Sequence, residues 1–211
     1  MKIKFWILVL VTTLFSCSIN GEYIKSELVY KEFSDLCYIE PIYSFESKDA
    51  LKSERGQGFI KYTNKVIDSI FLAKPQKYKV NQKVKIDEKY KSDLNLELIE
   101  ILKKIESHKT LENIPIPEKL STIDKSKLEF LMVSIIKPTL ISAEEKFSNS
   151  IVLGSNDQYF SVDSSEVSIL IFDLSKNKTV FYGKTSGKLN DMGYRKKIIN
   201  DLNSIYKSLK K

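Results

Sequence analysis

The sequence predicts an α/β (α+β) fold, in which amphipathic helices pack on a mixed β-sheet that includes a C-terminal β-hairpin. Three observations carry this prediction. Residues 166–174 and 179–187 are rich in β-branched and aromatic residues and flank a short polar turn at 175–178, which is the pattern of a hairpin. Residues 194–211 place apolar side chains at helical spacing. Upstream, strand and helix patterns alternate, as in a βαβ unit with a crossover helix.

The first residues, "MKIKFWILVLVTTLFSC", predict a signal peptide at 1–16. Lys2 and Lys4 form a basic start, and residues 5–15 form an apolar run. Eleven residues rise only about 16 Å as a helix, roughly half the hydrocarbon core of a bilayer. The run is therefore too short to span a membrane.

The junction "LFSC" resembles the lipobox of bacterial lipoproteins, with Leu14 at −3, Ser16 at −1 and Cys17 at +1. The resemblance implies lipidation of the Cys17 sulfur, cleavage before it and acylation of the new amine. Ordinary cleavage after Ser18 is the alternative, because Ser16 and Ser18 also satisfy the small-x-small rule. An acylated Cys17 leaves Cys37 without an intrachain disulfide partner, and we expect the Cys37 thiol to be buried in a strand.

The mature chain divides into a lipidated tether at 17–35, in which 27–33 could form an edge strand, and a single α/β domain at 36–211. Residues 37–45 predict a strand, and Pro41 within it indicates an edge, a strand end or a bulge. Residues 46–58 are polar and are interpreted as a flexible turn. Apolar spacing from Phe59 predicts a helix that Pro75 stops.

Further elements follow in order along the domain. Residues 77–86 are compatible with a strand, and Ser92 is the expected N-cap of a helix. A short helical turn follows Pro117. A buried strand at 128–136 is expected to close at Lys137–Pro138, and the hairpin is expected to place Val180 and Tyr182 on one face and Phe181 on the other. The helix that begins near Ser92 has an apolar stripe of Leu94, Leu98, Ile101, Leu102 and Ile105, and that of the terminal helix is Ile198, Ile199, Leu202, Ile205, Tyr206 and Leu209.

The C-terminal third is similar to a domain of bacterial envelope lipoproteins. Asp173, Val180 and Tyr182 match a hairpin pattern "D-x-x-x-x-x-x-V-x-[FWY]-x-G", with Gly183 one position before the glycine of the pattern, and residues 116–120 read "IPEKL" ahead of the next strand. The pattern resembles the α/β domain of the curli-secretion lipoprotein, the penicillin-binding-protein activator lipoprotein and the amino-terminal domain of TolB. It also resembles uncharacterised lipoproteins of Bacteroidetes. This resemblance implies an envelope lipoprotein and brings no catalytic or ligand residue with it.

The composition favours a solvated Lys-rich surface over nucleic-acid binding. The formal net charge is +7, but the basic residues are spread along the chain and only Arg55 and Arg195 are arginines. Bidentate phosphate and base recognition prefers arginine. The single histidine, His108, is expected at an exposed helix end. We recognise no catalytic, cofactor or metal motif, and none of these sites is predicted.

We therefore expect a non-enzymatic binding or scaffold module, held in the bacterial cell envelope by a lipid on Cys17. The expected partners are the membrane, through the lipid, and another envelope protein. The outer membrane is the expected anchor, with the domain in the periplasm or at the cell surface. The alternative is a periplasmic or cell-surface enzyme that acts on cell-wall or glycan substrates, which a convergent His/Asp/Glu/Ser cluster would favour.

Overall fold

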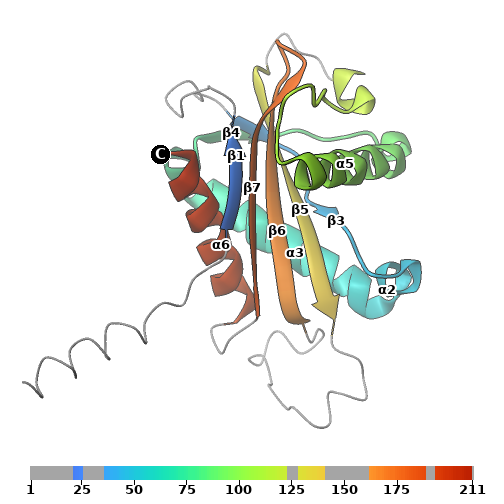
Figure 1. Cartoon of the computed structure of the whole chain (residues 1–211). Coiled ribbons are helices and arrows are strands. Elements are labelled where there is room, and N and C mark those ends of the chain that lie inside the picture. The colour runs from blue at the N-terminus through green and yellow to red at the C-terminus, as the bar shows by residue number, and fades with distance from the viewer. Residues whose placement is uncertain (1–20, 26–35, 123–127, 141–161, 189–192, 211) are drawn as a thin grey trace, which may run out of the picture.

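The computed structural model describes residues 21–25, 36–122, 128–140, 162–188 and 193–210 (Figure 1). All described elements follow residue 20, so a chain of residues 18–211 keeps every one of them. In chain order the elements are β1 (Gly21–Lys25), β2 (Leu36–Tyr38), β3 (Ile42–Tyr43), α2 (Lys48–Lys52), α3 (Glu54–Ala73), α4 (Pro75–Tyr78), β4 (Val80–Lys83), α5 (Glu88–His108), the 3₁₀ turn η2 (Glu118–Thr122), β5 (Phe130–Leu140), β6 (Val162–Asp173), β7 (Lys178–Lys188) and α6 (Tyr194–Leu209).

The strands form one mixed sheet in the order β1-β7-β6-β5-β2-β4, and the short β3 also pairs with β5. β4, β2 and β5 are parallel neighbours, and β5, β6, β7 and β1 are antiparallel neighbours. The path β2–α3–β4 is a parallel unit with a crossover helix, as the sequence predicts. The predicted α/β class, with a C-terminal hairpin in a mixed sheet, is confirmed.

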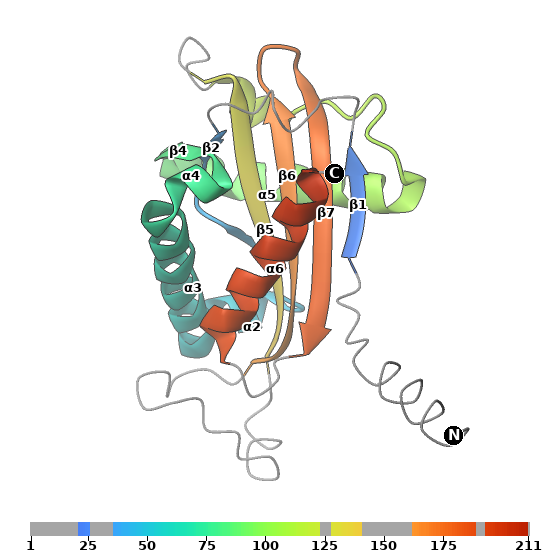
Figure 2. The same cartoon turned by 90° about the vertical axis from the view of Figure 1, so that its left-hand side faces the viewer.

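Helices cover both faces of the sheet. Figures 1 and 2 show α3 and α6 on one face and α5 on the other. Each face has its own hydrophobic core, because successive side chains of a strand point to opposite sides. Phe130 and Met132 of β5 join the core under α3 and α6, whereas Leu131 and Val133 join the core under α5. No helix in the described ranges is long and apolar enough to span a bilayer.

The expected tether at 17–35 contains a strand of the sheet, so that expectation needs correction at residues 21–25. β1 pairs antiparallel with β7, with Gly21 opposite Thr185. The hydroxyl oxygens of Tyr23 and of Ser204 in α6 lie 2.9 Å apart. The other expected edge strand, at 27–33, lies outside the described residues.

Most of the polar segment 46–58 is helical, in α2 and the first residues of α3, so its interpretation as a flexible turn is wrong. Ser47 caps α2 by accepting a hydrogen bond from the Ala50 N–H, and Ser53 caps α3 by accepting one from the Gly56 N–H. Gly56 is buried where α2 meets α3, and a Cβ there would collide with the carbonyl oxygen of Ala50. A glycine is thus required by this close approach of two backbones.

Two further boundaries differ from the sequence predictions. α5 begins at Glu88 with Asp87 as its N-cap, so Ser92 is not the cap; Asp87 accepts a hydrogen bond from the Lys89 N–H. β5 continues through Pro138, which lies opposite Ser165. β3 ends opposite Ile136, so a strand position with a single neighbour accommodates the proline.

The hairpin of β6 and β7 contains a bulge. The pairs Ile171–Phe181 and Phe172–Thr179 leave Val180 as an extra residue on β7. As a result Val180 and Phe181 both join the core under α3 and α6, while Tyr182 joins the core under α5. The prediction that Val180 shares a face with Tyr182 is wrong, because strict alternation does not continue through a bulge.

The Cys37 side chain is buried, as predicted, with 2% of its surface exposed. In the chain of residues 18–211 it is the single cysteine. We expect a thiol reagent to label it at least about a thousandfold more slowly in the folded chain than in denaturant, because labelling requires opening of a core strand. The time course of reagent absorbance, with and without denaturant, measures this ratio. Rapid labelling in the folded state would contradict the placement of β2.

Candidate functional site

A pocket of about 460 Å³ lies at the carboxyl ends of the parallel strands β2 and β4. The chain leaves β2 towards α3 on one face of the sheet and leaves β4 towards α5 on the other face. Crevices between adjacent strands whose connections diverge in this way are the usual ligand sites of α/β sheets. The volume falls within the range of about 300–1,000 Å³ found for small-molecule pockets.

The residues between β2 and β3 form one wall of the pocket. Tyr38 pairs with Met132 and Ile42 pairs with Ile135, so three residues on this side oppose two on β5. The extra residue makes the chain bulge out of the sheet around Pro41, which has no N–H for a ladder bond. The bulge brings Glu40 to the pocket wall.

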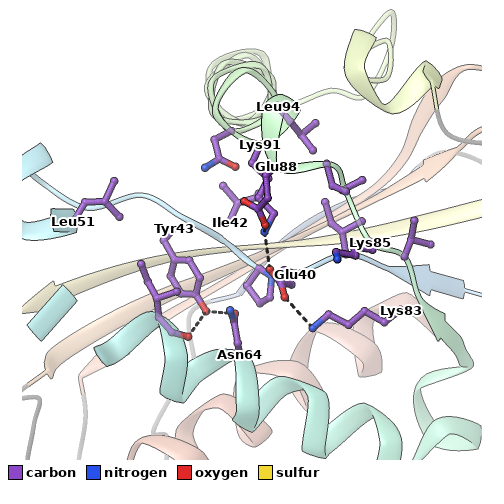
Figure 3. Close-up of a pocket in the computed structure, with 16 residues that line it drawn as sticks. Glu40, Ile42, Tyr43, Leu51, Asn64, Lys83, Lys85, Glu88, Lys91 and Leu94 are labelled. Atoms are coloured by element: carbon purple, nitrogen blue, oxygen red, sulfur yellow. Dashed lines mark hydrogen bonds and ion pairs between the residues drawn. The ribbon is translucent and has the colours of Figure 1, made fainter. Parts of the chain in front are cut away.

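Glu40 bridges two lysines across the pocket (Figure 3). Its Oε1 lies 3.3 Å from the Nζ of Lys83, at the end of β4, and its Oε2 lies 3.1 Å from the Nζ of Lys91 in α5. Each lysine has a second acidic partner. Lys83 contacts Asp68 of α3 at 2.8 Å, and Lys91 contacts Glu88 at 2.6 Å. The bridge therefore connects β4, the bulge, α3 and α5.

The ion pairs hold these groups in their charged forms. Partial burial acts to raise the pKa of Glu40, but hydrogen bonds from Lys91 and Lys83 outweigh it and hold that pKa below its usual value. Burial acts to lower the pKa of Lys83, and Asp68 and Glu40 together raise it above its usual value. For Lys91 the hydrogen bond to Glu88 is the largest cause of a raised pKa. The bridge is thus fully ionised at neutral pH.

The opposite part of the pocket is apolar. Tyr43 closes it beside α3, where its hydroxyl donates a 2.7 Å hydrogen bond to Asn64 Oδ1 (Figure 3). Burial raises the pKa of Tyr43, so its hydroxyl stays protonated. Leu51 of α2 adds a side chain from beyond the sheet. The remaining apolar lining residues are Ile39, Pro41, Ile42, Ile60, Val84, Ile86 and Leu94.

Two polar side chains of the pocket lack the partners that the others have. Asn95 of α5 contributes an Oδ1 atom that is shielded from solvent and accepts no hydrogen bond within the described part of the chain. Lys85 also lines the pocket and takes part in none of the ion pairs found between described residues. Figure 3 shows its amine directed to the space beside Glu40.

The residues singled out from the sequence do not gather here. Cys17 lies outside the described residues. His108 ends α5, where its Nδ1 lies 2.8 Å from the Lys104 carbonyl oxygen, about 20 Å along the helix from Asn95, the last pocket residue of α5. The sequence reasoning missed Glu40, Lys83 and Asn95 as pocket residues. Pro41, which indicated a bulge or strand end, was the one available signal.

No protein-family model and no curated protein matches the chain. Among solved structures it is similar to PelC of Paraburkholderia phytofirmans, a dodecamer, with 8% identity and a TM-score of 0.39 over 90% of this chain and 95% of that one. A point variant of the same dodecamer gives 9% identity and a TM-score of 0.40 over the same shares. At TM-scores this low the likeness bears on neither function nor assembly.

Proposed function

We propose that the protein is a bacterial envelope lipoprotein, anchored through lipid on Cys17, whose α/β domain is a non-enzymatic binding module with its ligand site in the pocket beside Glu40. The observation that carries the binding part is the ionised Lys83–Glu40–Lys91 bridge next to an apolar cavity. A fixed set of charges beside apolar walls orients a ligand without further ordering of the protein.

The anchor part of the proposal is supported by the sequence. "LFSC" follows a basic start and an 11-residue apolar run. More than one acyl chain attaches a protein stably to a membrane, whereas a single chain does so only marginally. The outer membrane is the proposed anchor, with the domain in the periplasm or at the cell surface.

The ionisation of the pocket favours binding over catalysis. A general acid or base works best with a pKa near the operating pH. The pKa of Glu40 is instead held below its usual value, and those of Lys83 and Lys91 are raised above theirs. The alternative of an enzyme on cell-wall or glycan substrates would require a carboxylic acid with a raised pKa, or a nucleophile and base, in this pocket.

Replacement of Cys17 tests the anchor. We expect Cys17→Ser to abolish incorporation of radiolabelled palmitate and to leave unprocessed precursor, because serine cannot form the thioether. Gel autoradiography of labelled cells measures both results. The matched control is Cys37→Ser, which removes the other cysteine and should label and mature normally. Normal labelling of Cys17→Ser would exclude lipidation at this residue.

A further inference from the structure

We propose that the pocket beside Glu40 binds a small amphipathic anion, which combines an apolar body, one carboxylate or sulfonate group, and one N–H or O–H donor. This inference rests on the proposed binding function and adds the chemical class of the ligand. Three properties of the pocket carry it: a lysine that takes part in none of the ion pairs found between described residues, an extended apolar wall, and a buried acceptor without a donor.

The ion pairs of the pocket leave one of its lysines without an acidic partner among the described residues. Its charged lining consists of three lysines and two glutamates, and Asp68, which lies outside the lining, also pairs with Lys83. Glu40 and Glu88 are both engaged, the first by Lys83 and Lys91 and the second by Lys91. A cationic ligand would have to compete with these lysines for carboxylates that are already paired.

Lys85 is the lysine of the pocket that takes part in none of the ion pairs between described residues. Of the acidic side chains nearby, Asp87 feels the charge of Lys85, but its carboxylate pairs with Lys89 at 3.3 Å. Lys85 is an exposed residue, and Figure 3 shows its amine directed to the space beside Glu40. An anionic group of the ligand would pair with the Lys85 ammonium, as a carboxylate side chain does with the other lysines of the pocket.

The apolar wall requires that the rest of the ligand be largely hydrocarbon or aromatic. Ile42, Ile60 and Val84 approach the cavity from β3, α3 and the end of β4, so three separate elements present apolar surface to one space. A sugar or an inorganic ion would leave this surface in contact with polar groups or water. An apolar body removes it from water.

Asn95 supplies the third property. A buried carbonyl oxygen without a donor is costly, and such groups are rare in folded proteins. Because Asn95 lines the pocket, an N–H or O–H group of a bound ligand can donate to it. The acceptor on α5 and the ammonium after β4 then fix the orientation of the ligand.

Two fluorescent dyes test this class of ligand. 1-Anilinonaphthalene-8-sulfonate has an aromatic body, a sulfonate and an N–H, and N-phenyl-1-naphthylamine is the same molecule without the sulfonate. Both are titrated into the chain of residues 18–211, and dissociation constants are taken from the fluorescence increase. We expect the sulfonate to bind more tightly than its neutral analogue. Native near-ultraviolet circular dichroism during the titration shows that the folded state binds.

Two substitutions locate the dyes in the pocket. Lys85→Met should raise the dissociation constant of the sulfonate dye about fivefold, which is the upper end of what an exposed ion pair contributes. The dissociation constant of the neutral dye should not change. Lys103→Met removes the same charge from an exposed position of α5 outside the pocket and should change neither dissociation constant. Asn95→Leu should weaken the binding of both dyes, because it removes the hydrogen-bond acceptor that both complexes use.

The outcomes separate the proposals. Equal affinity of the two dyes, with no effect of Lys85→Met, overturns the anionic class and leaves the pocket as the binding site. Equal effects of Lys85→Met and Lys103→Met on the dissociation constant of the sulfonate dye overturn the anionic class as well. They would show that the overall charge of the protein attracts the dye, and not a specific contact with Lys85. Failure of both dyes to bind the folded wild-type chain overturns the amphipathic class altogether. Palmitate labelling of the native protein is unaffected by any of these results and reports on the anchor alone.

Discussion

Removal of residues 194–211 is expected to abolish cooperative unfolding of the domain. α6 covers the β1–β7–β6 part of the sheet, and its contact with β7 is so close that a Cβ on Gly183 would lie 2.8 Å from Ile205. Six side chains at about 1.5–3 kcal/mol each contribute roughly 9–18 kcal/mol before the entropy of ordering is counted. Total stabilities are commonly about 5–15 kcal/mol. The buried apolar side chains of α6 are Tyr194, Ile198, Leu202, Ile205, Tyr206 and Leu209.

Chemical denaturation of the chain of residues 18–193 tests this expectation against residues 18–211. Leu202→Asp places a charge at a fully buried position and should cost several kcal/mol in the full-length domain. Asn200→Asp introduces the same residue with the same charge change at a partly exposed position of the same helix and should cost little. A truncated chain with a near-native unfolding midpoint would show that α6 is not part of the core. A basic amphipathic helix on an anionic membrane would then become the better interpretation.

Lys197→Met is expected to destabilise the domain by about 3–5 kcal/mol, because it leaves a buried carboxylate without its partner. Lys197 and Asp201 of α6 are 8% and 6% exposed at their side chains, and Nζ lies 2.6 Å from Oδ2. Lys197 also donates a 3.0 Å hydrogen bond to the carbonyl oxygen of Ser165 in β6. Replacement of both charged residues, Lys197→Met with Asp201→Leu, should recover much of the loss.

The pH dependence gives this second prediction a further readout. Burial raises the pKa of Asp201, and the attraction of Lys197 opposes that rise without cancelling it. A carboxyl with a higher pKa in the folded state binds more protons than in the unfolded state, so its protonation stabilises the fold as pH falls. In Lys197→Met the opposing attraction is absent, so the pKa of Asp201 rises further and protonation of Asp201 stabilises the fold more strongly. Denaturation at pH 7 and at pH 5 should therefore show a smaller cost of Lys197→Met at the lower pH, and an equal cost would contradict the burial of an unpaired carboxylate.

Strong local periodicity made the C-terminal half predictable from the sequence. Apolar residues of α6 recur on one helical face, and the hairpin strands flank a four-residue polar stretch. Segment 46–58 was misinterpreted because its helices α2 and α3 begin with polar turns. Their caps, Ser47 and Ser53, are short polar residues that also suit loops. Val180 was placed on the wrong face because a bulge has no signature in residue type alone.

The pocket could not be predicted in the same way. Glu40, Lys83 and Lys91 are brought together by the parallel pairing of β2 with β4 and by the packing of α5, and no local pattern encodes either. A glutamate or lysine in a chain with 29% charged residues carries no signal of its own. Pro41 marked where the strand is interrupted, but the sequence could not show which side chains that interruption faces.

The collision that a Cβ on Gly56 would cause with Ala50 has a consequence for the descent of this protein. α2 carries Leu51 into the pocket and depends on the missing side chain at position 56 to dock against α3. Any descendant that keeps the pocket must keep a glycine there, while the exposed residues around it are free to drift. Once homologous sequences are aligned, an alanine at position 56 should occur only together with changes in the segment 47–53. Such lineages would be those in which the proposed ligand has changed or been lost.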